Sequence, residues 1–142
     1  MKVRYSESIK YKMLVRLKAH SSNVVLRSDF ADLGDYRQVS RGLKALITDK
    51  ELVKIGFGLY AKAYQSQYTN SPIIKGGTDL ALREALTRLK IPFEPGSAEQ
   101  AYNAGESTQV PVRNIVRLKS RCRRLIRYKN SQLIFEGNIN AK

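Results

Sequence analysis

The chain has 142 residues and carries 26 lysines and arginines against 12 acidic residues, which gives a formal net charge of +14. That length suits one domain or two very small ones, and an apolar content of 42% is enough to build a core. The apolar runs span only a few residues, which excludes a membrane-spanning segment. With one cysteine and one histidine, neither a disulfide framework nor a zinc site of the usual His/Cys type can be assembled. We therefore expect a cytoplasmic protein that is not an enzyme and holds no catalytic residue, metal or cofactor.

The positive charge is spread evenly along the chain. Residues 1–64 and residues 65–142 each hold 13 basic and 6 acidic residues. Nucleic acid is the usual partner of such a field, because each neutralised phosphate releases condensed counterions. An anionic membrane is the weaker alternative, since no long amphipathic helix with a basic face is evident.

The first half of the chain predicts helix, short strand, two helices and a β-hairpin. The predicted elements are a helix from Ser6 to His20 that begins at Ser6 or Ser8, a strand over Val24–Leu26, a short helix between Ser28 and Gly34, a helix from about Tyr36 to Asp49 capped by Asp35, and two strands around a Gly56-Phe57-Gly58 turn. This order is that of a winged helix-turn-helix, which we place at residues 1–64.

The second half predicts a small α+β module. Residues 65–77 have the composition of a connection, and residues 78–142 begin with a helix of about Asp79 to Lys90, for which Thr78 is the predicted cap. A turn at Pro95-Gly96-Ser97 and a short helix follow, and beyond Pro111 the apolar period changes to two, which predicts strands in an antiparallel hairpin or meander. The predicted fold class is therefore α+β.

The helix from about Tyr36 to Asp49 is the candidate recognition helix. Its buried stripe is predicted to be Val39, Leu43, Leu46 and Ile47, which turns the polar residues outward, namely Arg37, Gln38, Ser40, Arg41 and Lys44. Arginine can grip guanine and glutamine can grip adenine in the major groove, while Ser40 and Lys44 suit phosphate. An ordinary solvated helix face is the alternative. Gly42 in the helix interior implies a close approach, either of another helix or of the DNA backbone.

Two further basic surfaces are predicted. Lys54 flanks the hairpin turn and could reach phosphate, with Phe57 at the tip. If strands over 112–118 and 122–128 paired across a turn, arginines would lie opposite each other, a cost that an anionic nucleic acid or an acidic partner would remove. The residues of this predicted basic hairpin are Arg113, Arg117, Arg123 and Arg127. Arg124 falls on its apolar side and is unexplained.

Several segments resemble the AbiEi-type antitoxin family. They are Asp29-Phe30-Ala31-Asp32-Leu33-Gly34, Ser40-Arg41-Gly42-Leu43-Lys44-Ala45-Leu46, the hairpin from Leu52 to Tyr60, Pro95-Gly96-Ser97-Ala98, Asn103 and Ser107-Thr108-Gln109-Val110-Pro111. The resemblance covers about residues 7–136. It implies a short winged-helix antitoxin of a type IV toxin–antitoxin system, on mobile elements or in phage defence. On that basis Arg37, Ser40, Arg41 and Lys44 would face operator DNA, with Lys54 on the wing. Phe57 stands where the family often has arginine, and Gly42 where alanine is usual.

The leading hypothesis is a DNA-binding transcriptional repressor of its own operon that also neutralises a cognate nucleotidyltransferase-like toxin. Its partners would be double-stranded operator or promoter DNA and that toxin, with no membrane; the oligomeric state stays open. The alternatives are a stand-alone regulator or nucleoid-type protein, a basic protein-interaction module, and an RNA-binding protein, because charge does not distinguish the two nucleic acids.

Overall fold

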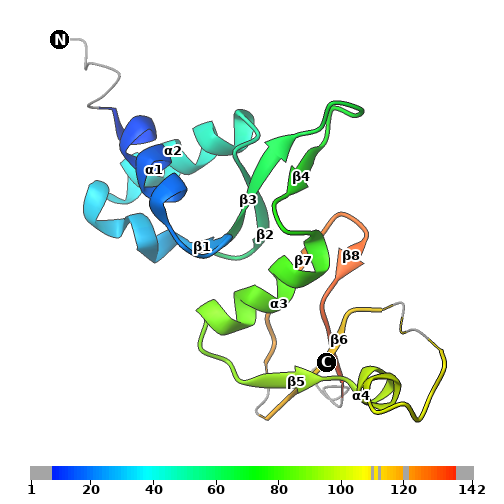
Figure 1. The fold of residues 1–142 in the computed structure, drawn as a ribbon. Helices are drawn as coiled ribbons and strands as arrows, with labels where there is room; N and C mark the ends of the chain where they lie inside the picture. The colour runs from blue at the N-terminus through cyan, green and yellow to red at the C-terminus, as the bar shows by residue number, and fades with distance from the viewer. Residues whose placement is uncertain (1–7, 110, 112, 120–121, 137–142) are drawn as a thin grey trace.

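The computed structural model describes residues 8–109, 111, 113–119 and 122–136, which form a mixed α+β fold (Figure 1). The elements are α1 (Ile9–Ala19), β1 (Val24–Leu26), the 3₁₀-helix η2 (Arg27–Leu33), α2 (Tyr36–Thr48), β2 (Leu52–Gly56), β3 (Leu59–Gln65), β4 (Pro72–Ile74), α3 (Thr78–Arg88), β5 (Phe93–Pro95), α4 (Ser97–Asn103), β6 (Ile115–Leu118), β7 (Arg127–Tyr128), β8 (Ser131–Gln132) and β9 (Ile134–Glu136).

The central sheet is antiparallel, in the order β1-β3-β2, with β4 paired to the far end of β3. Ala61 of β3 lies opposite both Val24 of β1 and Val53 of β2, which fixes the register of the three strands. The β2–β3 turn contains Gly58 at φ +67°, a backbone conformation that glycine adopts without strain. The strand predicted over Val24–Leu26 and the hairpin predicted around Gly56-Phe57-Gly58 are both confirmed.

Each face of the central sheet packs against different helices, because successive residues of a strand point to opposite sides. One hydrophobic cluster joins α1, η2 and α2 to the sheet through Met13, Leu17, Val25, Phe30, Val39, Leu43, Leu46, Leu52 and Tyr60. The other joins the sheet to α3 and the C-terminal strands through residues that include Val24, Val53, Ile55, Leu59, Ala61, Ala63, Leu82, Leu86, Val116, Ile126 and Leu133. The second cluster therefore combines residues from both halves of the chain, and the predicted connection over 65–77 contains β4, a strand of the sheet.

Helices α1 and α2 contact each other closely, and this contact accounts for Gly42. A Cβ built on Gly42 would lie 2.1 Å from the Sδ atom of Met13, a fully buried side chain of α1. Of the two explanations that the sequence left open, the structure thus supports the approach of another helix. Gly42 is part of the buried face of α2, whereas Ile47, which we predicted to be buried, is 36% exposed.

The short helix after β1 differs from its prediction. It is a 3₁₀-helix that begins at Arg27, whereas the sequence had indicated a start after Ser28 with that serine as the N-cap, and the carboxylate of Asp29 accepts a hydrogen bond from the Leu26 backbone amide. Gly34 ends it with an extended backbone, at φ 178°, instead of the left-handed conformation expected of a glycine after a helix. Similarly, α3 begins at Thr78 with Gly77 before it, so the predicted Thr78 cap is wrong.

The predicted basic hairpin is also wrong in its pairing. Strand β6 pairs antiparallel with β5 and parallel with β9, while β7 pairs with β8 in a separate two-stranded ribbon. Val112, Ser120 and Arg121, which belonged to the predicted hairpin, lie outside the described residues. The observed pairing places Arg117 opposite Glu94 and Glu136, and thereby avoids the arginine-against-arginine pairs that the predicted hairpin would have contained.

Candidate nucleic-acid interface

The N-terminus of α2 is held by a reciprocal cap. The Asp35 carboxylate accepts a hydrogen bond from the Gln38 backbone N–H at 2.8 Å, and the Gln38 side-chain oxygen accepts one from the Asp35 backbone N–H at 2.9 Å. Gln38 was predicted to read adenine, which requires both its oxygen and its nitrogen. Because the oxygen is used within the cap, a bidentate contact with a base would require the cap to open.

Arg27 of η2 binds the first turn of α2. One of its Nη atoms donates to the Tyr36 carbonyl at 2.8 Å and to the Ser40 hydroxyl at 2.6 Å, and its guanidinium carbon lies 3.9 Å from the centroid of the Tyr36 ring. Ser40, a predicted phosphate ligand, is therefore occupied within the molecule. The Tyr36 side chain remains 75% exposed at the start of the helix.

Three of the five predicted recognition residues project from α2 without a partner. Arg37, Arg41 and Lys44 are exposed, and within the described part of the chain none of them takes part in an ion pair. They contrast with Lys10, Arg16, Arg83 and Arg88, each of which binds a carboxylate. Unpaired cations along one helix face leave their full charge available to an anionic partner.

The tip of the β2–β3 hairpin lies beside the irregular segment 122–126. Arg124 donates to the Phe57 carbonyl at 3.4 Å, and a Cβ on Gly56 would lie 3.0 Å from the Leu125 carbonyl, so glycine permits this close approach. A groove of about 420 Å³ runs between the two segments, lined by Lys54, Ile55, Gly56, Phe57, Arg124, Leu125 and Arg127. The structure therefore brings Arg127 of the predicted basic hairpin together with Lys54 of the wing. It also gives Arg124, which the sequence left unexplained, a place beside them.

The other half of the predicted basic hairpin lies in a mixed-charge environment. Arg117 Nε is 3.4 Å from Glu136 and its Nη1 is 3.8 Å from Glu94, while Arg113 lines a separate pocket together with Glu99 and Glu136. Hydrogen bonds from Ser97 hold the pKa of Glu136 below its usual value, and Arg83 does the same to Glu99. These carboxylates stay charged at neutral pH and neutralise much of the local positive charge. Arg113 and Arg117 therefore lie beside these carboxylates, whereas Arg127 lines the groove with Lys54.

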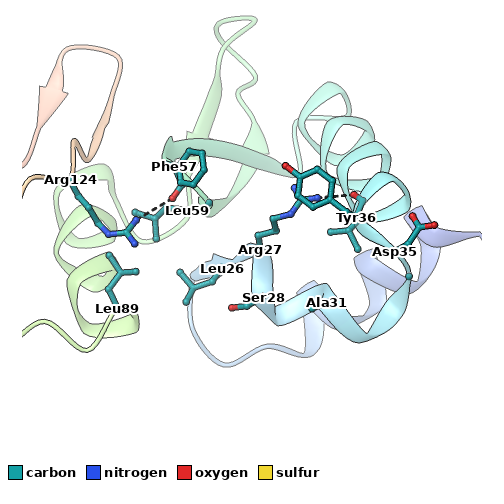
Figure 2. Close-up of a pocket in the computed structure, with 13 residues that line it drawn as sticks. Leu26, Arg27, Ser28, Ala31, Asp35, Tyr36, Phe57, Leu59, Leu89 and Arg124 are labelled. Carbon is teal, nitrogen blue, oxygen red and sulfur yellow. Dashed lines mark hydrogen bonds between the residues drawn. The ribbon is translucent and has the colours of Figure 1, made fainter.

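A larger cavity of about 550 Å³ opens between η2, the start of α2 and the hairpin tip (Figure 2). Leu26, Leu59 and Leu89 form part of its apolar lining. Arg124 and Asp35 lie at opposite ends of the labelled group, and Phe57 lies between Arg124 and Tyr36. Sequence reasoning missed Arg27, Tyr36 and Leu89 as members of one site, because the turn between η2 and α2 and the packing of α3 bring them together.

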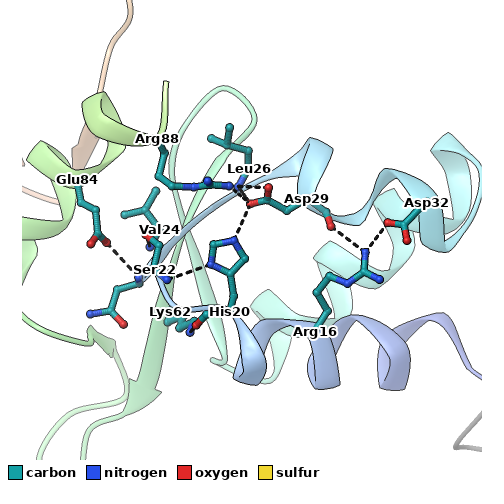
Figure 3. Close-up of polar contacts among 11 residues, drawn as sticks. Arg16, His20, Ser22, Val24, Leu26, Asp29, Asp32, Lys62, Glu84 and Arg88 are labelled. Atoms are coloured by element: carbon teal, nitrogen blue, oxygen red, sulfur yellow. Dashed lines mark hydrogen bonds and ion pairs between the residues drawn. The ribbon is translucent and has the colours of Figure 1, made fainter. Parts of the chain in front are cut away.

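A polar network ties α1, η2 and α3 to each other (Figure 3). The Asp29 carboxylate accepts hydrogen bonds from Arg88 of α3 at 2.5 Å, and it lies 3.6 Å from Nε2 of His20 at the end of α1. Arg16 of α1 binds the Asp29 carbonyl and the Asp32 carboxylate. Close by, Lys62 is buried and donates to the His20 carbonyl, and its burial lowers the pKa of its ammonium group.

No protein-family model, curated protein or solved structure matches the chain. Among the residues that the structure describes, no helix combines the length and apolar character needed to cross a membrane. The same residues contain no group of three or more His, Cys, Asp or Glu side chains arranged to hold a metal ion.

Proposed function

We propose that the protein is a winged helix-turn-helix DNA-binding antitoxin, which represses its own operon and neutralises a cognate nucleotidyltransferase-like toxin. The order α1, β1, η2, α2, β2, β3 and the sheet order β1-β3-β2 support this architecture. In it, η2 and α2 are the two helices of the helix-turn-helix, α2 is the recognition helix, and the β2–β3 hairpin is the wing.

One observation carries the DNA-binding half of the proposal: the exposed face of α2 presents Arg37, Arg41 and Lys44 without ion-pair partners among the residues that the structure describes. Arg37 and Arg41 read guanine edges in the major groove, and Lys44 binds phosphate. Lys54, Arg124 and Arg127 line the groove beside the wing and bind the backbone that flanks the site. The toxin-neutralising half rests on the sequence resemblance alone.

The DNA-binding half is tested by fluorescence anisotropy with the protein's own upstream promoter duplex and a scrambled duplex, at several salt concentrations. We expect the promoter duplex to bind roughly a thousandfold more tightly at physiological salt, the scale of a specific reader. Arg41→Gln should remove most of that preference, whereas Lys75→Gln, an equal loss of charge at an exposed residue far along the chain, should leave it intact. Equal and steeply salt-dependent binding of both duplexes would contradict sequence-specific repression, and tighter binding of a matched RNA would replace DNA as the target.

The antitoxin half is tested by co-expression with the toxin encoded beside it. We expect the wild-type chain to restore growth, and Arg41→Gln to restore it equally, because that residue serves DNA alone. Replacing Arg113 and Arg117 together by glutamine tests whether the module around β6 serves the toxin. Failure of the wild-type chain to protect would overturn the antitoxin half and leave a stand-alone regulator.

A further inference from the structure

We propose that the cavity between η2, the start of α2 and the wing tip binds a small planar aromatic molecule that carries an anionic group. Its volume of about 550 Å³ lies within the range of ligand sites, which are mostly apolar with a few convergent polar groups. The apolar part is lined by Leu26, Ala31, Val39, Leu59 and Leu89, which suits the flat body of such a molecule.

The aromatic specificity follows from two unusually exposed rings. Phe57 is 87% exposed at the wing tip and Tyr36 is 75% exposed at the start of α2, and both line the cavity. The Tyr36 ring is held in place by the Arg27 guanidinium stacked on it, so the ring is already ordered before any ligand arrives. An ordered ring offers a flat surface for stacking at little cost in conformational entropy, and Phe57 adds a second aromatic surface to the cavity lining.

The anionic specificity follows from the charges at the cavity. Arg27 and Arg124 both line it, and within the described part of the chain Arg124 makes a single hydrogen bond, at 3.4 Å to the Phe57 carbonyl. Asp35 is the one acidic residue among the described residues of the lining, and its carboxylate already accepts a hydrogen bond from the Gln38 backbone amide in the α2 cap. A carboxylate or sulfonate on the ligand would therefore complement the two guanidinium groups. Arg124 has more free hydrogen-bond donors than Arg27 and is the main candidate to bind it.

Occupancy of the cavity also regulates DNA binding, an extension that rests on the proposed function. The cavity lies between the first turn of the recognition helix and the tip of the wing, both of which approach the duplex in the proposed complex. An anion bound there consumes the charge of Arg27 and Arg124 and repels the incoming phosphates. The ligand therefore weakens duplex binding, and by reciprocity the duplex weakens ligand binding by the same factor.

The experiment uses two probes that share one aromatic body and differ by a sulfonate group, 8-anilinonaphthalene-1-sulfonate and its uncharged parent N-phenyl-1-naphthylamine, both titrated by fluorescence into the full chain without DNA. We expect one site for the sulfonate. Ala31→Phe fills the cavity and should weaken both probes at least about tenfold, whereas Ala104→Phe, at an exposed alanine outside the cavity, should weaken neither.

Arg124→Gln should weaken the sulfonate about fivefold, the scale of an exposed ion pair, and leave the uncharged probe unchanged. Arg123→Gln is its matched control, because Arg123 is exposed, adjacent and equally charged but does not line the cavity. Circular dichroism confirms that each variant is folded. Equal sulfonate binding by wild type and Ala31→Phe, or equal losses in Arg124→Gln and Arg123→Gln, would overturn the site.

The regulatory step is read separately, by repeating the promoter anisotropy titration at saturating sulfonate probe. We expect weaker duplex binding in the wild type and no effect of the probe in Ala31→Phe. A duplex affinity that the probe leaves unchanged would overturn the regulation. If no duplex binds at all, the proposed function fails, while the dye titrations still decide the site.

Discussion

Gly42 shows how one residue sets the spacing of two helices. The fully buried Met13 side chain of α1 occupies the space into which any larger side chain at this position would project. Glycine in a helix interior costs about 1 kcal/mol relative to alanine, and the close packing of α2 against α1 that glycine permits offsets this loss. Sequence reasoning identified the anomaly, but the identity of the approaching group depended on which residue of α1 faced α2.

Gly42→Ala should therefore lower the stability of the protein although it raises helix propensity. Overpacking a well-filled core costs about 1–3 kcal/mol and the gain in helix propensity offsets about 1 kcal/mol of it, so we expect a net loss of up to about 2 kcal/mol in the free energy of unfolding. Urea denaturation measures this loss. The control is a double-mutant cycle with Met13→Ala, in which the alanine at 42 should cost much less once the methionine is gone. A more stable Gly42→Ala single variant would show that Met13 moves aside freely.

At the scale of elements, the contact between η2 and α3 depends on Asp29. Its carboxylate caps η2 through the Leu26 amide and binds Arg88 of α3, and both side chains of the pair are less than one-third exposed. The Nε atom of Arg88 is already buried without a hydrogen-bond partner among the described residues. Removing the charge of the Asp29 carboxylate would leave the Arg88 guanidinium partly buried without an opposite charge.

Asp29→Asn should accordingly destabilise the protein by about 2 kcal/mol, the range for leaving a charged group without its partner. Asp32→Asn is the matched control on the same helix, since Asp32 binds Arg16 at an exposed site and its loss should change little. Thermal unfolding at neutral pH compares the two. An equal effect of both substitutions would mean that the tie between η2 and α3 contributes nothing beyond a surface ion pair.

The elements differ in how far the sequence could predict them. Helix α2 and the β2–β3 hairpin follow from local signals, namely an aspartate cap, helical spacing of apolar residues and a Gly-x-Gly turn. Helix α2 and strand β2 were predicted nearly to the residue, whereas β3 continues to Gln65, beyond the predicted Leu59-Tyr60-Ala61. Strand β6 was also predicted as a strand, but its partners were not. It pairs with β5, which precedes it by some twenty residues, and with β9, which follows the β7–β8 ribbon in the sequence. The alternation of apolar residues in a strand shows which face is buried but does not identify the strand that pairs with it. The same limit affected the candidate site. Three of the five predicted recognition residues are exposed and have no ion-pair partner among the residues described, as their helical spacing suggested. The groupings of Arg124 with Phe57 and of Arg27 with Tyr36, in contrast, depend on tertiary contacts that the sequence does not reveal.

At the scale of the whole molecule, the central sheet joins the two halves of the chain. One of its faces is covered by α1, η2 and α2, and the other by α3 and segments that follow it. Val53, Ile55 and Ala61 of the sheet are buried in the same cluster as Leu82 of α3 and Ile126 of the C-terminal segment. A chain cut between the halves would therefore expose an apolar sheet face of the N-terminal domain predicted over 1–64.

We expect a fragment of residues 1–77 to lack the cooperative urea unfolding transition of the full chain, because the stability gained by covering the second face of the sheet is lost. Circular dichroism and tyrosine fluorescence, which no tryptophan masks in this chain, follow the transition in both proteins. The control is the full chain cleaved once by protease within residues 67–70, an exposed stretch between β3 and β4. In that nicked protein the two halves should stay associated through the shared core and unfold together. A fragment that unfolds cooperatively at the midpoint of the full chain would instead establish two independent domains, and the cavity lined by Leu89 and Arg124 would then lie at an interface able to open.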